Sequence, residues 1–161
     1  MVITELLERN AKLYPTDTAL VEVNPAVKPQ PNQTWREYSL IETTPGGRYR
    51  REMTWKDFDT KANRFANLLL TRGVKKGDKV AILLMNCLEW LPIYFGILKT
   101  GALAVPMNYR YTAEEIRYRA ELADVDVLVF GEEFITRVDA VREKLPRIHN
   151  WFYVGEACPD F

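Results

Sequence analysis

The stretch from Lys79 to Asn108 (KVAILLMNCLEWLPIYFGILKTGALAVPMN) constrains the fold most strongly, because it predicts a strand, a helix and a second strand in close succession. Val80 to Met85 is an unbroken apolar run, which is typical of a strand covered on both faces in a parallel sheet. The segment from Leu88 to Thr100 is long and apolar enough for a helix, and Leu103 to Val105 is a second apolar run. Together they predict a βαβ unit, whose connection is expected to be right-handed.

Two residues mark the expected ends of this helix. Asn86 has a short polar side chain that can cap a first turn. Gly101 lies just past Thr100, where a residue in the left-handed conformation is favoured. Leu83, in the preceding strand, is expected to be fully buried.

The same pattern continues along the chain. The apolar runs Val125 to Phe130 and Trp151 to Val154 predict two further strands. A T-x-x-E capping box at Thr112 predicts the start of one connecting helix, and Phe134 to Leu145 predicts another. The order from Val80 onward is therefore βαβαβαβ, which indicates an α/β fold with a doubly wound parallel sheet.

Smaller elements are expected before this sheet. Thr4 is expected to cap a helix that runs to Tyr14, and Ala19 to Val23 predicts a short strand. A T-x-x-D capping signal at Thr54 begins a longer amphipathic helix, which Gly73 is expected to end.

Between these elements, residues 24–47 contain several prolines and few aliphatic side chains, which predicts an irregular β excursion. Within it, residues 38–43 and 49–53 are expected to pair as a hairpin around Pro45-Gly46-Gly47. Arg51 and the neighbouring arginines are expected to protect an exposed strand edge rather than to bind an anion.

Composition bounds the class of protein. The chain has 161 residues, which favours a single domain, and its 22 basic and 22 acidic residues give no net charge. A neutral chain argues against general affinity for nucleic acid. Two cysteines predict no disulfide framework and a reduced, cytoplasmic setting. Acidic residues in the first turns argue against a secretory signal, and no apolar run is long enough to cross a bilayer.

A sheet of this class binds ligands beyond the carboxyl ends of its strands. The polar or small residues expected at that edge are Asn86, Cys87, Asn108, Tyr109, Arg110 and Gly131. Neither a G-x-G-x-x-G nor a G-x-x-x-x-G-K-[ST] phosphate loop occurs in the chain. Arg110 follows a strand and precedes a helix N-terminus, a setting that suits an anion site and equally a solvated loop arginine.

Two other kinds of site were weighed. Cys87 and His149 are a thiol and an imidazole, but they lie on different connections and no third partner stands out, so a free thiol and a surface histidine are favoured. No cluster of residues has the spacing of a metal site. We therefore predict no catalytic residue and no metal ligand in this chain.

Several motifs resemble those of the adenylate-forming acyl-CoA synthetases. LKTGALAVPMN at residues 98–108 is similar to the L-K-A-G-A-x-x-V-P-x-N motif of that family, and GVKKGDKVAILLMN at residues 73–86 to its G-v-x-k-G-D-x-V-a-i-l-l-x-N strand. NYRYTAEEIRY at residues 108–118 is similar to its N-x-R-l-t-x-x-E-l-x-y step, and MTWKDFDTKANRFANLL at residues 53–69 to its T-Y-x-E-L-x-x-x-x-N-x-x-A-x-x-L helix. ITELLERNAKLYPTDTAL at residues 3–20 is similar to the first helix of that family. The order and spacing of these motifs together are specific, and the resemblance extends over nearly the whole chain.

The resemblance implies a reaction. Members of the family activate a carboxylic acid with ATP and Mg²⁺ to an acyl-adenylate, and then transfer the acyl group to the thiol of CoA. The glycine-rich phosphate loop, adenine motif, ribose-binding aspartate and catalytic lysine of the family are not found here, so the chain is expected to be an N-terminal fragment that is inactive alone. In some CoA ligases the arginine of the N-x-R step lies near the CoA nucleotide; Arg110 matches it, with Asn108 and Tyr109 as neighbours.

The resemblance also implies an organisation. Residues 1–161 are expected to form one N-terminal subdomain of a fatty-acid or aromatic-acid CoA ligase, with a helix, β excursion and helix at 1–78 and the parallel α/β layer at 79–161. The expected partners are the acid, ATP, CoA, the rest of the same chain and, for the fragment, further copies of itself. A free-standing flavodoxin-like module and a protein-interaction domain remain as alternatives, and the acid itself cannot be read from these residues.

Overall fold

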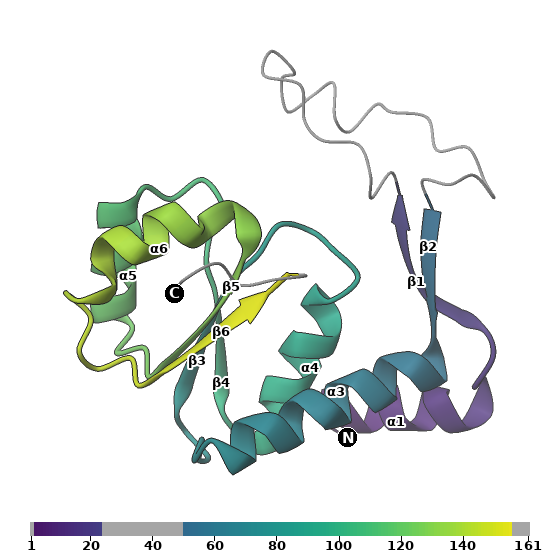
Figure 1. The fold of residues 1–161 in the computed structure, drawn as a ribbon. Coiled ribbons are helices and arrows are strands. Elements are labelled where there is room, and N and C mark those ends of the chain that lie inside the picture. Colours follow the sequence, from purple (N-terminus) through teal and green to yellow (C-terminus); the bar gives the residue numbers. More distant parts are fainter. Residues whose placement is uncertain (1, 24–49, 156–161) are drawn as a thin grey trace.

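A computed structural model describes residues 2–23 and 50–155 of the chain. The elements follow in the order α1 (Ile3–Leu13), β1 (Thr18–Val23), β2 (Arg50–Thr54), α3 (Trp55–Thr71), β3 (Lys79–Leu83), α4 (Trp90–Thr100), β4 (Leu103–Pro106), α5 (Ala113–Leu122), β5 (Val127–Gly131), the 3₁₀ turn η1 (Glu132–Phe134), α6 (Ile135–Arg142) and β6 (Asn150–Val154). Figure 1 shows an α/β layer built on β3 to β6, with α1 and the β1–β2 ribbon beside it.

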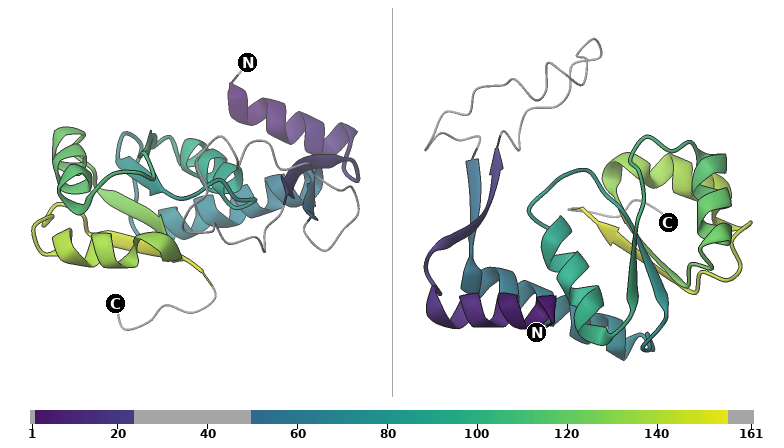
Figure 2. Two further views of the ribbon diagram at one scale, coloured as in Figure 1. Left: turned by 90° about the horizontal axis from the view of Figure 1, so that it is seen from above. Right: turned by 180° about the vertical axis from the view of Figure 1, so that it is seen from behind.

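The main sheet of the described residues has four parallel strands in the order β4-β3-β5-β6. The chain moves from β3 outward to β4, then returns past β3 to β5 and β6, so the sheet is doubly wound as the sequence predicts. Helices α5 and α6 cover one face, and α3 and α4 cover the other (Figures 1 and 2).

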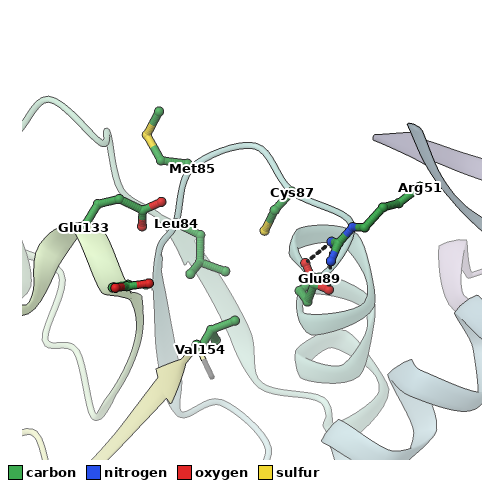
Figure 3. A pocket seen from close by; sticks show the side chains of 10 residues that line it. Arg51, Leu84, Met85, Cys87, Glu89, Glu133 and Val154 are labelled. Carbon is green, nitrogen blue, oxygen red and sulfur yellow. Dashed lines mark hydrogen bonds and ion pairs between the residues drawn. The ribbon is translucent and has the colours of Figure 1, made fainter. Parts of the chain in front are cut away.

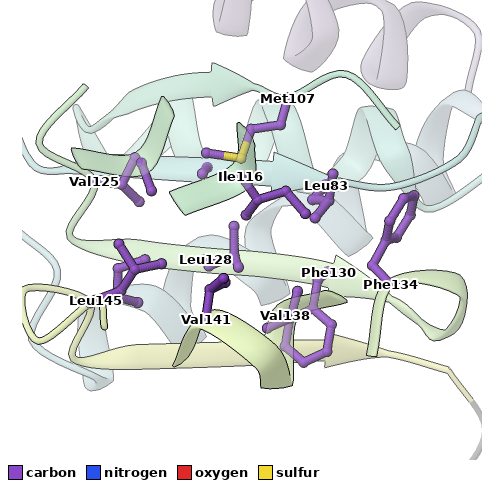
Figure 4. Close-up of a cluster of buried hydrophobic side chains, with 13 residues drawn as sticks. Leu83, Met107, Ile116, Val125, Leu128, Phe130, Phe134, Val138, Val141 and Leu145 are labelled. Carbon is purple, nitrogen blue, oxygen red and sulfur yellow. The ribbon is translucent and has the colours of Figure 1, made fainter. Parts of the chain in front are cut away.

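Strand β3 is buried because both of its faces are covered. Ala81 and Leu83 pack into the core cluster beneath α5 and α6, whereas Val80 and Ile82 pack into the cluster beneath α3 and α4. All four side chains are fully buried, which confirms the predicted burial of Leu83. Figure 4 shows Leu83 among the side chains of the α5–α6 cluster, with Phe130 and Phe134 close by.

Helices α3 and α4 pack closely because a glycine lies at their crossing. An added Cβ at Gly96 would lie 2.9 Å from the backbone oxygen of Ala62 and 3.0 Å from Cδ1 of Phe65. A third, smaller cluster, which includes Leu7 and Met53, joins α1 and the β1–β2 ribbon to α3.

Most predicted helix ends are confirmed. The Thr54 hydroxyl accepts from the backbone N–H of Asp57 at the start of α3, and Thr112 and Glu115 form the capping box of α5. Gly101 ends α4 in the left-handed conformation, with φ of 80°.

Two predicted caps are wrong. Val2, not Thr4, precedes the first turn of α1, and the Glu5 carboxylate accepts from its backbone N–H. Helix α4 begins after Glu89 rather than near Asn86. Leu88 and Glu89 form a turn before the helix, and the Glu22 carboxylate, distant in sequence, accepts from the backbone N–H of Leu88 at 3.2 Å.

The predicted hairpin is corrected in part. Residues 50–54 form β2, but their partner in the described structure is β1, which they pair in antiparallel register. Residues 38–43 lie outside the described residues. Arg51 lies opposite Glu22 in this register and makes an ion pair with it. The arginine therefore lies on an exposed ribbon, as expected, and also has a specific partner there. None of the described helices is long and apolar enough to cross a membrane.

Candidate functional site at the carboxyl edge of the sheet

The four strands of the main sheet run parallel, so the segments that follow them meet at one edge. These segments are residues 84–89 after β3, residues 107–112 after β4, η1 after β5, and Gly155 after β6. This is the edge at which doubly wound sheets bind ligands.

A pocket of about 440 Å³ opens at this edge. Its described lining comes from β2, the segment after β3, the segment after β5 and the end of β6, and consists of Arg51, Leu84, Met85, Cys87, Glu89, Gly131, Glu132, Glu133, Val154 and Gly155. Figure 3 shows Leu84 and Val154 at the apolar base, with Glu133 on one side and Cys87, Glu89 and Arg51 on the other.

The charges of this pocket do not suit a phosphate. Arg51 is paired with two carboxylates, because its Nη2 lies 2.6 Å from Oε2 of Glu22 and 3.1 Å from Oε2 of Glu89. These two carboxylates neutralise its positive charge. Glu132 and Glu133 add two further acidic side chains to the lining. An anionic ligand would therefore meet net negative charge in the pocket.

The pocket thiol is not an activated nucleophile. Burial, followed by the charge of the Glu89 carboxylate, raises the pKa of Cys87 to about 11, so the thiol stays protonated at neutral pH. His149 lies just before β6, at the opposite edge of the sheet from Cys87, which follows β3. Five-residue strands are about 16 Å long, so the two do not form a catalytic pair. Both expectations, a free thiol and an exposed histidine, agree with the structure.

The segment after β4 places Arg110 at the same edge. Met107 is buried, and its backbone N–H donates to the carbonyl oxygen of Ile82 at 2.8 Å, which ties the segment to the sheet. The Asn108 side-chain oxygen accepts from the backbone N–H of Arg110 at 2.9 Å, and the Asn108 carbonyl accepts from Tyr111 N–H at 3.0 Å. These bonds form a tight turn in which Arg110 is exposed.

Tyr109 lies directly against the Arg110 side chain. Nε of Arg110 donates to the Tyr109 hydroxyl at 3.0 Å, and its guanidinium carbon is 5.5 Å from the centre of the Tyr109 ring. Tyr109 itself is half-buried and packs against the core beneath α5 and α6. The structure thus brings the three predicted residues together in one turn, with Asn108 shaping the backbone and Tyr109 contacting the guanidinium.

One residue of this region was missed by the sequence reasoning. Nη1 of Arg137, on α6, donates to the carbonyl oxygens of Tyr109 and Tyr111 at 2.9 and 2.8 Å. The periodicity of apolar residues in α6 indicates only the helix face on which this arginine lies, and it does not predict these contacts. A positive residue in the first turn of a helix, where the helix dipole disfavours it, is the signal that was available.

The described residues fit some of the expected ligands better than others. No group of three or more His, Cys, Asp or Glu side chains within residues 2–23 and 50–155 could hold a metal ion. An exposed guanidinium at the ligand edge fits a phosphate group, since its planar donors match phosphate oxygens. Mg²⁺ is therefore assigned to none of the described residues.

Comparison with known proteins decides the family. The model of the AMP-binding enzyme family matches residues 7–157. The chain belongs to the AMP-binding enzyme family. The match includes the whole α/β layer and the turn that carries Arg110, so the resemblance inferred from the motifs is confirmed at the level of the family.

Similar family members are named as CoA ligases. A medium/long-chain-fatty-acid–CoA/3-oxocholest-4-en-26-oate–CoA ligase of Mycolicibacterium smegmatis is 36% identical over 109 residues, which cover 68% of this chain and 20% of the relative. The chain thus spans about a fifth of the length of that curated relative.

Two solved structures share the fold. The anthranilate CoA ligase AuaEII, in complex with anthranoyl-AMP, superposes with a TM-score of 0.77 at 27% identity over 98% of this chain and 25% of that one. The N-terminal domain of FACL13 from Mycobacterium tuberculosis superposes with a TM-score of 0.74 at 26% identity, over 94% of this chain and 33% of that one. These similarities confirm the predicted α/β fold with its parallel sheet and preceding helix.

Proposed function

We propose that the protein to which this chain belongs is an acid–CoA ligase, and that residues 1–161 form its N-terminal subdomain. The observation that carries the proposal is the family match over residues 7–157, together with similar proteins that are named as CoA ligases. Within the subdomain, 1–78 supplies the first helix, the β excursion and α3, and 79–161 supplies the parallel layer.

The proposed reaction has two half-reactions. A carboxylate oxygen of the acid attacks the α-phosphorus of ATP, which releases pyrophosphate and leaves an acyl-adenylate. The sulfur of CoA then attacks the acyl carbon, so that the thioester forms and AMP leaves with the electron pair of the broken bond. Mg²⁺ would supply charge neutralisation for the phosphates in the first step.

The acid is proposed to be a fatty or an aromatic acid. The similar proteins include one named for medium- and long-chain fatty acids and one named for anthranilate, an aromatic acid. The described pocket has an apolar base of Leu84 and Val154, but its acidic rim would repel a free carboxylate, so we do not assign the acid to it.

Arg110 is proposed to bind a phosphate group of CoA. It is exposed at the ligand edge of the sheet, and the turn that carries it is fixed by bonds from Asn108 and to the sheet. A guanidinium can hold a phosphate through two parallel hydrogen bonds, whereas an ammonium acts as a point charge. Asn108 and Tyr109 are proposed as neighbours of the CoA site, through the backbone and the Arg110 side chain.

The test uses the full-length protein that contains this chain. Acid-dependent exchange of pyrophosphate into ATP reports the first half-reaction, and thioester formation reports the second. Arg110→Ala should raise the KM for CoA by about 10- to 150-fold, the equivalent of about 1.5–3 kcal/mol for a charged hydrogen bond, and leave exchange near the wild-type rate. Arg110→Lys should recover part of the loss, and Arg9→Ala, an exposed arginine on α1, should change neither.

The same measurements can contradict the proposal. A full-length protein that shows no acid-dependent exchange is not a ligase of this kind. Equal damage to both half-reactions by Arg110→Ala would make the residue structural, and unchanged kinetics would make it a solvated loop residue.

The 161-residue chain alone is proposed to be inactive and to self-associate. It carries no glycine-rich phosphate loop to stabilise charge on the α-phosphorus, so exchange should stay at background. Apolar surface that packs against other parts of the full protein would be exposed in the isolated chain, and such patches drive association. Light scattering at high concentration should give a mass above that of the monomer.

A further inference from the structure

Arg137 bridges two parts of the molecule that are distant in sequence. Its Nη1 donates to the carbonyl oxygens of Tyr109 and Tyr111, which precede it by 28 and 26 residues. Its guanidinium carbon lies 4.7 Å from the centre of the Phe134 ring, which is fully buried. The residue is half-buried, and its planar head contacts both an aromatic ring and two carbonyl oxygens.

The presence of an arginine at position 137 is not explained by a contribution to the stability of α6. Arg137 lies in the first turn of the helix, where the aligned peptide dipoles disfavour a positive charge. A contact from its Nη2 to the carbonyl oxygen of Glu133, at 3.4 Å, is long. The short hydrogen bonds of Arg137 are instead those to the turn after β4. These bonds explain why an arginine lies at this position.

The two accepting carbonyls lie on either side of Arg110. Asn108 already holds the two peptide planes next to Arg110, because its side chain accepts from the N–H of Arg110 and its carbonyl accepts from the N–H of Tyr111, but neither bond ties the turn to α6. Nη1 of Arg137 binds the carbonyl of the 109–110 peptide and that of the 111–112 peptide, so one nitrogen of α6 holds the turn at two points. The position of Arg110 relative to α6 therefore depends on these two bonds.

We propose that Arg137 is a positioning residue for the second half-reaction, because it holds residues 109–111 in the conformation that presents Arg110 to a phosphate group of CoA. This inference rests on the proposed function of Arg110. CoA binding then depends on α6 as well, although the phosphate-binding guanidinium of Arg110 lies in the turn after β4. Lysine at position 137 could reach one carbonyl but could not bind both through a planar group that also stacks on Phe134.

The first test measures the turn itself in the full-length protein. Arg137→Met keeps a side chain that can pack on Phe134 but removes the donors. Hydrogen exchange of the peptide that contains residues 109–112 should become about tenfold faster or more, and Arg137→Lys should give an intermediate rate. Arg142→Met, a matched change at the other end of α6, should leave that peptide at the wild-type rate. Unchanged exchange in Arg137→Met would overturn the inference whatever the kinetics.

The second test separates the two half-reactions. Arg137→Met should raise the KM for CoA and leave the acid-dependent pyrophosphate exchange unchanged, with partial rescue by Arg137→Lys. If Arg137 acts through Arg110, adding Arg137→Met to Arg110→Ala should raise the KM no further than Arg110→Ala does. Multiplied effects in the double variant, or equal loss of both half-reactions in Arg137→Met, would overturn the positioning role.

The two tests also separate this inference from the proposed function. If the wild-type protein forms no CoA thioester, the proposed function fails by that result alone. If the wild type is a ligase and Arg110→Ala raises the KM for CoA but Arg137→Met does not, the proposed function stands and the role of Arg137 fails.

Discussion

Nζ of Lys99 lies 2.7 Å from Oε1 of Glu8, so a lysine of α4 reaches the first helix of the chain. The same nitrogen lies 3.0 Å from Oδ1 of Asp59 on α3 and makes an ion pair with it. The Lys99 side chain is only 10% exposed. One ammonium, itself largely shielded from water, therefore joins three helices, α1, α3 and α4.

Loss of this ammonium should loosen α1. Lys99→Met keeps the apolar stem but leaves the Asp59 carboxylate without its cation, so the free energy of unfolding should fall by about 1.5–3 kcal/mol in urea titrations. Lys61→Met, an exposed lysine on α3, should change it by less than about 0.5 kcal/mol. Equal effects of the two substitutions would show that the three-helix contact contributes nothing.

The same contact gives the fold a dependence on pH. The hydrogen bond from Lys99 and then its charge lower the pKa of Glu8 below the ordinary value of 4.5. A carboxyl whose pKa is lowered in the folded state adds stability above its unfolded pKa, and this contribution is lost as the pH falls through the folded pKa. Stability measured as the pH falls below 4.5 should therefore decrease more steeply in the wild type than in Glu8→Gln.

Core packing on β3 can be tested with a pair of leucines. Leu83 is fully buried, whereas Leu70 on α3 is 52% exposed. Leu83→Ala should lower the free energy of unfolding by about 2–5 kcal/mol, since it removes buried methyl groups and leaves a cavity. Leu70→Ala should change it by no more than about 0.5 kcal/mol. A small effect at both positions would contradict the placement of β3 in the centre of the sheet.

Gly96 tests the contact between α3 and α4. Alanine in a helix interior is favoured over glycine by about 1 kcal/mol on conformational grounds. The added Cβ, however, would lie 2.9 Å from the backbone oxygen of Ala62, which cannot move away as a flexible side chain could. The cost of overpacking, about 1–3 kcal/mol, should outweigh the gain. Gly96→Ala should therefore lower the thermal midpoint, and a raised midpoint would contradict the close crossing.

Cys87 should react slowly with alkylating reagents. Burial and the Glu89 carboxylate raise its pKa from 9.0 to about 11, so its thiolate fraction at pH 8 is roughly 100-fold lower than that of an ordinary thiol. The rate should be measured in a Cys158→Ser background, which leaves a single cysteine. It should rise about tenfold for each pH unit toward pH 11. A rate at pH 8 equal to that of free cysteine would contradict the burial of this thiol.

Local patterns predicted the elements that local physics determines. Thr54 and Thr112 cap helices through bonds to residues three positions on, and Gly101 ends α4 through its own backbone conformation. The start of α4 could not be predicted in this way, because the Glu22 carboxylate that holds Leu88 comes from another strand. The partner of β2 was missed for the same reason, since strand pairing depends on contacts distant in sequence.

In the candidate site, too, local contacts can be predicted from the sequence and contacts between distant segments cannot. Arg110 was predicted from the sequence because it lies between a predicted strand and a predicted cap, and its role stays a prediction. Its contact with the Tyr109 hydroxyl joins neighbours in the chain, so it could have been predicted from the sequence. The bonds from Arg137 to the carbonyls of that turn join segments more than 25 residues apart, and no periodicity predicts them.

The alternation along β3 has a consequence for how this sequence can diverge. Ala81 and Leu83 contact the layer of α5 and α6, whereas Val80 and Ile82 contact the layer of α3 and α4. A substitution at Ala81 can therefore be compensated only by changes in one helical layer, and a substitution at Val80 only by changes in the other. Adjacent positions of a single short strand are expected to belong to separate groups of covarying residues, so the two sides of the protein can drift at different rates while the strand between them stays in register.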